Sequence, residues 1–93
     1  MTEKKYIDWK DDMARFEAYL REQESAEATV AKYLRDIRTF MTFAEGRTWI
    51  EKSDILRYKD WLMENYSVNS ANSMIVALNQ FLSFLELGRM KLK

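Results

Sequence analysis

Apolar residues recur along most of the chain at intervals of three and four, which is the spacing of one face of an α-helix. The clearest stretch runs from Val30 to Ala44 and spans about four helical turns. A similar stripe occupies residues 6–23, a third follows the connection 47–52, and a fourth covers residues 67–88. No alternating pattern typical of a strand competes with these stripes. The sequence therefore predicts an all-α domain, a compact bundle of four amphipathic helices joined by short loops.

Capping residues and glycines mark the expected ends of these helices. Proline, which breaks helix interiors, is absent from the whole sequence. Gly46 and Gly88 each follow an apolar stripe, where a helix often ends in a left-handed residue, so both are predicted helix stops. The candidate N-caps are Ser25 for the second helix, Glu51 or Ser53 for the third, and the run 67–70 for the fourth. The residues alone do not decide between the two candidates for the third helix.

Most aromatic residues fall on the apolar stripes, so they are expected in the core rather than on a surface that stacks nucleic-acid bases. They are Trp9, Phe16, Tyr33, Phe40, Tyr58, Trp61 and Phe81. Trp49 is different, because it lies in the connection before the third helix.

The residue types that the chain lacks exclude several kinds of chemistry. The 93 residues argue for one domain and include neither His nor Cys, which removes zinc fingers, thiolate nucleophiles, disulfides and Ser-His-Asp triads. Paired carboxylates, a Gly-rich phosphate loop and metal-ligand spacing are also missing, so no catalytic site, cofactor or metal ion is expected within these residues. No apolar run approaches the roughly 18 residues that cross a bilayer, and no signal-peptide core follows the N-terminus. We therefore expect a cytoplasmic protein with no membrane partner.

The net charge is zero, from 15 basic and 15 acidic side chains, which taken alone argues against binding nucleic acid. The charges are nevertheless distributed unevenly. Residues 1–24 carry 5 basic and 7 acidic side chains, a net charge of −2, whereas residues 67–93 carry 3 basic and 1 acidic, a net charge of +2. A surface that attracts anions is therefore compatible with a total of zero.

Two predicted helix faces carry side chains suited to DNA. In the second helix Lys32, Arg35 and Arg38 form a narrow basic line outside the apolar stripe, from which Asp36 is expected to be displaced. The exposed positions of the fourth helix are uncharged as far as Glu86. They are Asn69, Ser70, Asn72, Ser73, Asn79, Gln80 and Ser83. Amides and hydroxyls can donate to phosphates or contact base edges without carboxylate repulsion, although each face taken singly is more typical of a solvated helix surface.

Short motifs follow one another along nearly the whole chain in a characteristic order. The first half contains F-E-A-Y-L at residues 16–20, then Ser25, Thr29-Val30, Tyr33, Asp36-Ile37 and Phe40. The second half contains Ile55, Tyr58 and Leu62, then S-V-N-S-A-N at residues 67–72, and Ile75, Ala77-Leu78, Phe81, Phe84-Leu85 and Gly88. From about Trp9 to Gly88 this order resembles the N-terminal core-binding domain of the tyrosine recombinases, the phage and transposon integrases. Glu51 and Ser70 depart from the pattern, because the family prefers Thr at both positions.

The resemblance implies a SAM-like orthogonal bundle that grips one side of duplex DNA and positions a separate catalytic domain. It assigns residues 1–88 to the core-binding domain and residues 89–93 to the start of a linker. The chain alone would then not be an enzyme, whereas its parent would break and rejoin DNA as the integrase of a mobile element. The implied partners are double-stranded DNA at an attachment or recombination site, the C-terminal catalytic domain, and other recombinase protomers on the DNA.

Carried over position by position, the resemblance places the DNA contacts on the basic line of the second helix and the neutral polar face of the fourth. The implied DNA-binding residues are Thr29, Lys32, Arg35, Asn69, Ser70 and Ser73. The alternative function is a helical protein–protein interaction module with no role on DNA. Affinity for duplex DNA that falls steeply with salt would separate the two functions.

Overall fold

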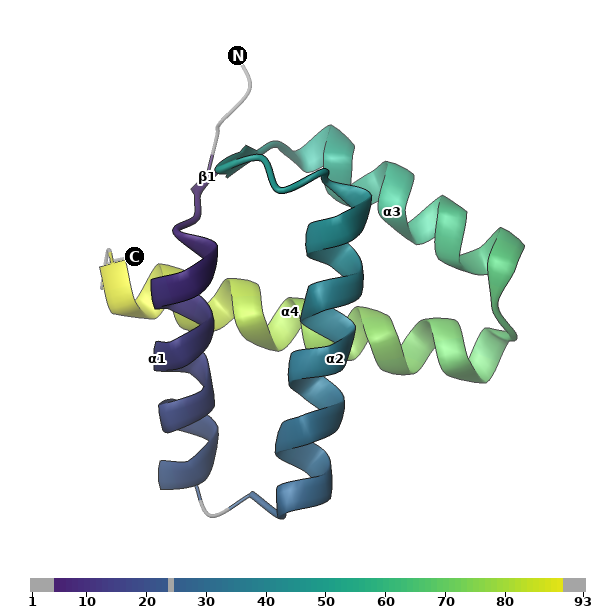
Figure 1. The fold of residues 1–93 in the computed structure, drawn as a ribbon. Helices are drawn as coiled ribbons and strands as arrows, with labels where there is room; N and C mark the ends of the chain where they lie inside the picture. Colours follow the sequence, from purple (N-terminus) through teal and green to yellow (C-terminus); the bar gives the residue numbers. More distant parts are fainter. Residues whose placement is uncertain (1–4, 24, 90–93) are drawn as a thin grey trace.

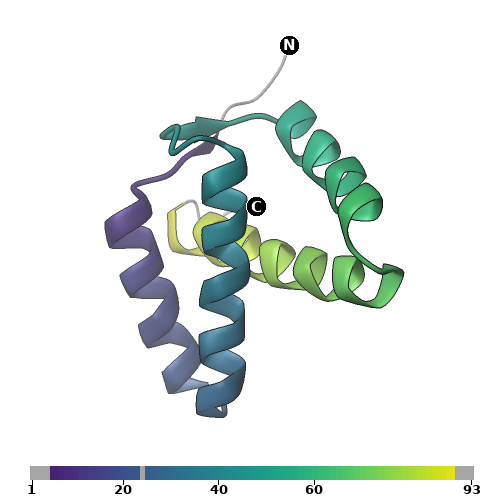
Figure 2. The same ribbon diagram turned by 45° about the vertical axis from the view of Figure 1, so that its right-hand side comes forward.

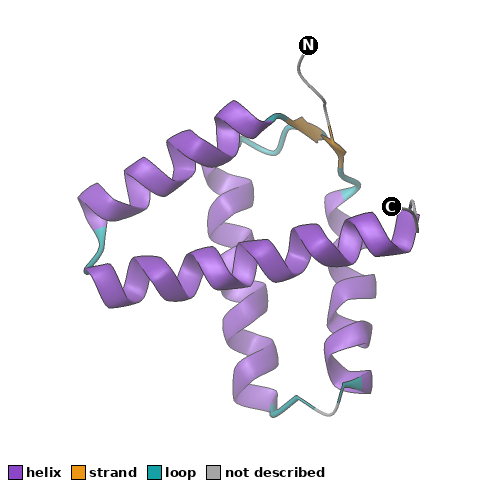
Figure 3. Ribbon diagram, turned by 180° about the vertical axis from the view of Figure 1, so that it is seen from behind, coloured by secondary structure: helices purple, strands orange, loops and turns teal. Residues whose placement is uncertain are grey.

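Two helices of opposite direction, α1 (Trp9–Glu22) and α2 (Glu27–Phe43), stand side by side, and the long helix α4 (Val68–Arg89) crosses both of them (Figure 1). The computed structural model describes residues 5–23 and 25–89, and the side chains of residues 6–23 and 25–85. Helix α3 (Lys52–Asn65) leads from the far end of α2 to the start of α4, and the view from behind shows α4 lying across the other two (Figure 3). These four helices confirm the predicted all-α bundle.

Aromatic rings hold the crossing helices together. Phe81 of α4 meets Phe16 of α1 edge to face, with 5.3 Å between ring centroids, and stacks against Trp9 at 6.2 Å. Phe40 of α2 contacts Tyr58 of α3 at 4.8 Å, which attaches the third helix to the same cluster. Each buried ring contributes about 1.5–3 kcal/mol through the apolar surface that it removes from water. The aromatic residues expected in the core are all part of it or packed against it.

A short pair of strands, which the sequence did not predict, ties the N-terminal segment to the connection between α2 and α3. Strands β1 (Lys5–Tyr6) and β2 (Trp49–Ile50) pair antiparallel, and the Ile7 N–H extends the contact by donating to the Thr48 carbonyl at 2.8 Å. The pair lies where the chain enters α1 (Figure 2). Two residues are too few to show alternation, which explains why the strands escaped the sequence pattern and why Trp49 was assigned to a loop.

Helix α1 begins at Trp9, later than the predicted start at Tyr6, because Asp8 caps it. The Asp8 carboxylate accepts from the Asp11 N–H at 3.2 Å, and the Asp12 carboxylate accepts from the Asp8 N–H at 2.9 Å. This reciprocal arrangement satisfies backbone donors that the first helical turn leaves free. The turn therefore fixes where the extended N-terminal segment ends.

The predicted cap of α2 was wrong by one residue. Ala26, not Ser25, occupies the N-cap position, and it makes no side-chain cap hydrogen bond. Ser25 lies too far upstream, since its backbone N–H donates to the Leu20 carbonyl and closes the end of α1. For α3 the structure selects Glu51, whose N–H donates to the Asp54 carboxylate at 2.8 Å. Among the cap candidates in the run 67–70, the structure selects Ser67, whose hydroxyl accepts from the Ser70 N–H at 3.2 Å.

The two glycines behave differently. Gly46 follows α2 with φ +71°, next to Glu45 at φ +58°, and its N–H donates to the Met41 carbonyl at 3.0 Å. The predicted stop at Gly88 was wrong, because α4 continues through Gly88 to Arg89. Glycine permits a left-handed residue but does not impose one, and a helix can contain it at a modest cost. No helix of the described residues is long and apolar enough to cross a membrane.

The buried carboxylate of Asp54 joins the connection between α2 and β2 to α3 through an ionic network with two partly exposed arginines. The Asp54 side chain is 4% exposed and accepts from Arg47 at 2.8 Å and from Arg57 at 2.5 Å, in addition to the Glu51 N–H. Burial alone would raise the pKa of Asp54, but the hydrogen bonds and the two guanidinium charges outweigh it and lower the pKa below its ordinary value of 3.8. Arg47 also lies 4.7 Å over the Trp49 ring.

We expect Asp54→Asn to lower the free energy of unfolding by about 2 kcal/mol at pH 7, because the charge-assisted hydrogen bonds are lost. Since folding lowers the pKa of Asp54, its contribution is complete above 3.8 and disappears as the pH falls through the folded-state pKa. Urea unfolding at several pH values measures this directly. The difference in unfolding free energy between the unmodified protein and Asp54→Asn should therefore shrink in acid. Asp60→Asn, at an exposed site of α3, is the control. A difference that stays constant with pH would contradict the role assigned to the Asp54 carboxylate.

Candidate functional site

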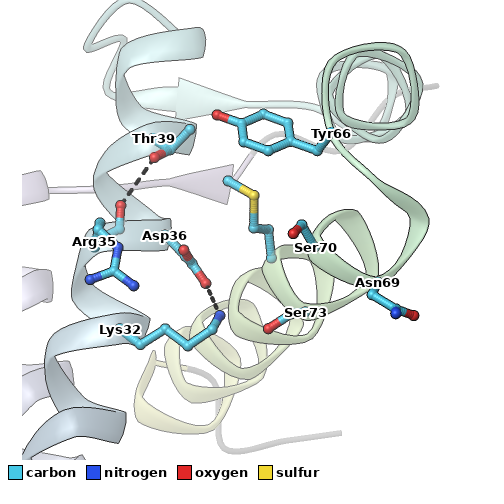
Figure 4. Close-up of a pocket in the computed structure, with 9 residues that line it drawn as sticks. Lys32, Arg35, Asp36, Thr39, Tyr66, Asn69, Ser70 and Ser73 are labelled. Carbon is cyan, nitrogen blue, oxygen red and sulfur yellow. Dashed lines mark hydrogen bonds and ion pairs between the residues drawn. The ribbon is translucent and has the colours of Figure 1, made fainter.

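Helices α2 and α4 leave an open hollow of about 420 Å³ between them, which we call the α2–α4 hollow. Its lining residues are Lys32, Arg35, Asp36 and Thr39 from α2, Tyr66 from the α3–α4 connection, and Asn69, Ser70, Ser73 and Met74 from α4. Five of the six residues predicted to bind DNA therefore meet in one place (Figure 4). The sixth, Thr29, does not line the hollow and lies exposed one turn before Lys32.

The helical repeat explains why these residues share the hollow. On α2 the lining positions are separated by three and four residues, as they are on α4, so each set occupies one helix face. On α2 the apolar stripe that adjoins these positions carries Ile37 and Phe40, and on α4 Leu78 and Phe81 follow the lining residue Met74 by four and seven positions; all four are buried. Burial of the apolar stripes therefore dictates which polar side chains face one another across the hollow.

The α2 side of the hollow contains an ion pair. The Lys32 ammonium donates to the Asp36 carboxylate one helical turn later, at 2.5 Å. The expectation that Asp36 is displaced from the basic line was wrong, since positions i and i+4 of a helix are neighbours. Figure 4 shows the two side chains bent toward each other within the hollow.

The predicted basic line also divides between two surfaces. Arg35 is exposed and lines the α2–α4 hollow, and no ion pair of its guanidinium is found among the described residues. Arg38 points instead to a second hollow, between α1 and α2, whose apolar lining includes Trp9, Met13 and Met41. Three residues turn a helix by about 300°, so each step of three shifts the position by about 60° around the axis, and the two steps from Lys32 place Arg38 about 120° away from it.

The α4 side of the hollow is free of charged side chains. Asn69 and Ser70 are exposed, Ser73 is partly buried, and Met74 is buried behind them. In Figure 4 the Ser70 and Ser73 side chains lie on the turns that face α2, while Asn69 is directed away from α2 at the far rim. With two cations and one carboxylate on α2, the hollow carries a formal charge of +1. Such a surface can hold a phosphate and offer neutral hydrogen bonds beside it.

Three lining residues were not identified from the sequence. Thr39 follows Arg35 by one turn, and its hydroxyl donates to the Arg35 carbonyl at 3.2 Å. Tyr66 is the C-cap of α3 and packs edge to face on Trp61, with ring centroids 5.8 Å apart. Met74 belongs to the apolar side of α4. Thr39 follows Arg35 by four positions and Met74 follows Ser70 by four, so the helical spacing could have identified both. The position of Tyr66, by contrast, depends on how α3 and α4 meet.

Tyr58 of α3 lies close to this site from the core side. Its ring is fully buried, and its hydroxyl has no hydrogen-bond partner among the described residues. Burial raises the pKa of the Tyr58 phenol, and the charge of Asp36 and the neighbouring Tyr66 raise it further. The phenol therefore stays protonated, and the hydroxyl lies within electrostatic reach of the Asp36 carboxylate.

The fold and the hollow together define a small all-α module with a polar, cation-bearing surface. Comparison with protein families supplies the relationship: the family described as phage integrase, N-terminal SAM-like domain, matches residues 13–87. The chain belongs to this family, which confirms the resemblance to the core-binding domains and the SAM-like character of the bundle. Neither the curated proteins nor the solved structures give a significant match.

We expect Tyr58→Phe to leave the free energy of unfolding unchanged or to raise it by up to about 1 kcal/mol, because it removes a buried hydroxyl without a partner. Tyr58→Ala, by contrast, should cost about 3–5 kcal/mol through the cavity that it creates. Thermal and urea unfolding of both variants measure these effects. A loss of more than 1 kcal/mol in Tyr58→Phe would instead reveal a hydrogen-bond partner such as a bridging water.

Proposed function

We propose that this domain binds duplex DNA through the α2–α4 hollow, as the core-binding domain of a tyrosine recombinase. The observation that carries the proposal is the meeting of Lys32 and Arg35 with the neutral face of α4 around one concave surface. Membership of the integrase family supports it independently. A helix edge with neutral amides and hydroxyls fits a major groove, and the neighbouring cations suit the phosphates that border it.

The side chains divide into two groups by the contacts that they can make. Arg35 is exposed and unpaired among the described residues, so it contacts a phosphate. Thr29, one turn before Lys32, extends the same contact along the backbone of the DNA. Asn69 and Ser73 can donate and accept at once, which suits them to base edges or to sugar and phosphate oxygens. Ser70 lies between them on the same face of α4.

A chain with no net charge binds DNA weakly when isolated, because counterion release supplies most of the affinity of a single module. Tight binding then depends on a catalytic domain that closes on the other side of the duplex and carries out strand breakage and rejoining in DNA integration. In this arrangement residues 1–88 grip the half-site, and other protomers assemble on the same DNA. The proposed linker begins at Arg89, and its remaining residues, 90–93, lie outside the described part of the chain.

The alternative, a protein–protein interaction module, is favoured by one feature, the hollow between α1 and α2. Trp9, Met13 and Met41 give it an apolar lining, with Lys10 and Arg38 beside them. A helical partner lying there would bind through apolar contacts that survive moderate salt. The salt dependence of DNA binding therefore distinguishes the two functions. Substitutions of the residues that line each hollow test the role of that hollow.

We expect Arg35→Gln to weaken binding to duplex DNA of any sequence and to flatten the slope of log K against log salt by about 0.9, because one phosphate contact is lost. Fluorescence anisotropy with a labelled duplex between about 50 and 200 mM salt measures both quantities. Arg38→Gln is the matched control, since it removes the same charge from the same helix but lines the other hollow. Equal effects of the two substitutions would show that only the total charge matters and would contradict the proposed surface.

We expect Ser73→Asp to weaken binding to the same duplex by about tenfold, because a carboxylate placed in the hollow repels the phosphates. Ser83→Asp adds the same charge to an exposed position of α4 outside the hollow and should change affinity by less than about twofold. Anisotropy titrations at one low salt concentration compare them. If Ser73→Asp still binds the duplex and Ser83→Asp does not, the result would contradict the proposed surface and would indicate that DNA contacts another part of α4.

A further inference from the structure

The α2–α4 hollow contains a carboxylate, which is unexpected on a surface proposed to attract phosphates. The Asp36 side chain is 7% exposed, whereas its partner Lys32 is 36% exposed and lies nearer the opening. A buried charge is screened by salt much less than an exposed one. Asp36 therefore acts on any anion that approaches the hollow, at every salt concentration in which DNA binding is measured.

The surroundings of Asp36 make it dependent on Lys32. The ammonium contacts the carboxylate at 2.5 Å. Close by lie the buried hydroxyl of Tyr58, which makes no hydrogen bond to any described residue, and the buried side chain of Met74. If the Lys32 side chain left Asp36 to pair with another anion, the carboxylate would stay buried without its partner, which is strongly unfavourable. The state in which Lys32 pairs with Asp36 is therefore more stable than the state in which Lys32 leaves Asp36 and pairs with a phosphate.

We infer that Asp36 is a specificity-determining residue of the hollow: by holding Lys32 in an ion pair, it keeps the ammonium charge from attracting the DNA backbone. This inference rests on the proposed function. The two charges of the pair cancel, which leaves Arg35 as the cation of the hollow that attracts phosphate. Because phosphate contacts are the same for every sequence, reducing them gives the neutral contacts of α4 a larger share of the binding free energy.

The pair also limits how the lysine can act when DNA is bound. An ammonium has three donors, and one of them is held by Asp36. A phosphate near Lys32 would meet the carboxylate within the same hollow, so the gain from one charge is offset by repulsion from the other. Lys32, which the resemblance counts among the DNA-binding residues, therefore has a charge-compensated role, whereas Arg35 makes the phosphate contact.

Substitution of the pair tests the inference through the salt dependence of binding to a mixed-sequence duplex. Asp36→Asn keeps the shape of the side chain and releases Lys32, so we expect the slope of log K against log salt to steepen by about 0.9 and binding at low salt to tighten three- to tenfold, roughly. The double variant Lys32→Gln with Asp36→Asn keeps the net charge, and we expect its slope and affinity to match the unmodified domain within about twofold. Asp60→Asn, an exposed carboxylate on α3, is the control for total charge and should change affinity by less than about twofold.

The outcomes separate this inference from the proposed function. If the unmodified domain binds without salt dependence, or Arg35→Gln leaves the slope unchanged, the proposed function fails and the inference fails with it. If Arg35→Gln flattens the slope but Asp36→Asn does not steepen it, or the double variant loses about one unit of slope, the inference alone is overturned. Circular dichroism melting checks that each variant is folded. Where Asp36→Asn is unfolded, the double variant decides the question, because neutral side chains replace the buried pair without leaving a charge behind.

Discussion

The packing of aromatic rings where α4 crosses α1 and α2 is the constraint on which the rest of the structure depends. Phe81 contacts Phe16 and Trp9, while Trp9 also reaches Phe40, so three helices are joined through one cluster. Rings of this size fit together only at a narrow range of distances and angles, which fixes how α2 and α4 cross. The α2–α4 hollow exists because two helices that cross can be in full contact only near the crossing. Its lining is then whatever side chains the sequence places on the diverging faces.

Buried carboxylates determine the finer geometry around this cluster. Asp12 accepts from the backbone at the start of α1, and Asp54 joins two arginines to the start of α3. Asp36 differs from both, since it faces the hollow and pairs with a lysine of its own helix. A buried carboxylate requires a partner in every case, but the consequence depends on where it lies. Near a helix start it secures the fold, whereas in the hollow it removes charge from a surface that would otherwise attract any polyanion.

The sequence predicts the helices and the core well because both follow from apolar periodicity. The stripe of α2 buries Val30, Leu34, Ile37 and Phe40 as its spacing requires. Features that depend on pairing between distant segments were not predicted, such as the two-residue strands and the contribution of Tyr66 to the hollow. For the candidate site, helix phase places Lys32 and Arg35 on one face of α2 and the polar residues of α4 on another, whereas only the resemblance to the core-binding domains indicated that the two faces act together. Helix phase does not reveal that Asp36 holds Lys32, although the spacing of four was visible, because the exposure of each side chain depends on the crossing of α4.

Zero net charge acquires a specific meaning once the side chains are located. A domain can bind DNA weakly because its cations are few, or because they are present and held by carboxylates. In this chain Arg21 pairs with Glu17 and Glu27, Arg47 and Arg57 share Asp54, and Lys32 is held by Asp36. Paired cations contribute to the fold and to the orientation of side chains, but little to long-range attraction. Within the hollow Arg35 is exposed, and no ion pair of it occurs among the described residues, so this one residue can account for much of the attraction of the hollow for phosphate. Binding then depends chiefly on how well the neutral face of α4 fits the groove, which is the condition under which sequence and shape are distinguished most strongly.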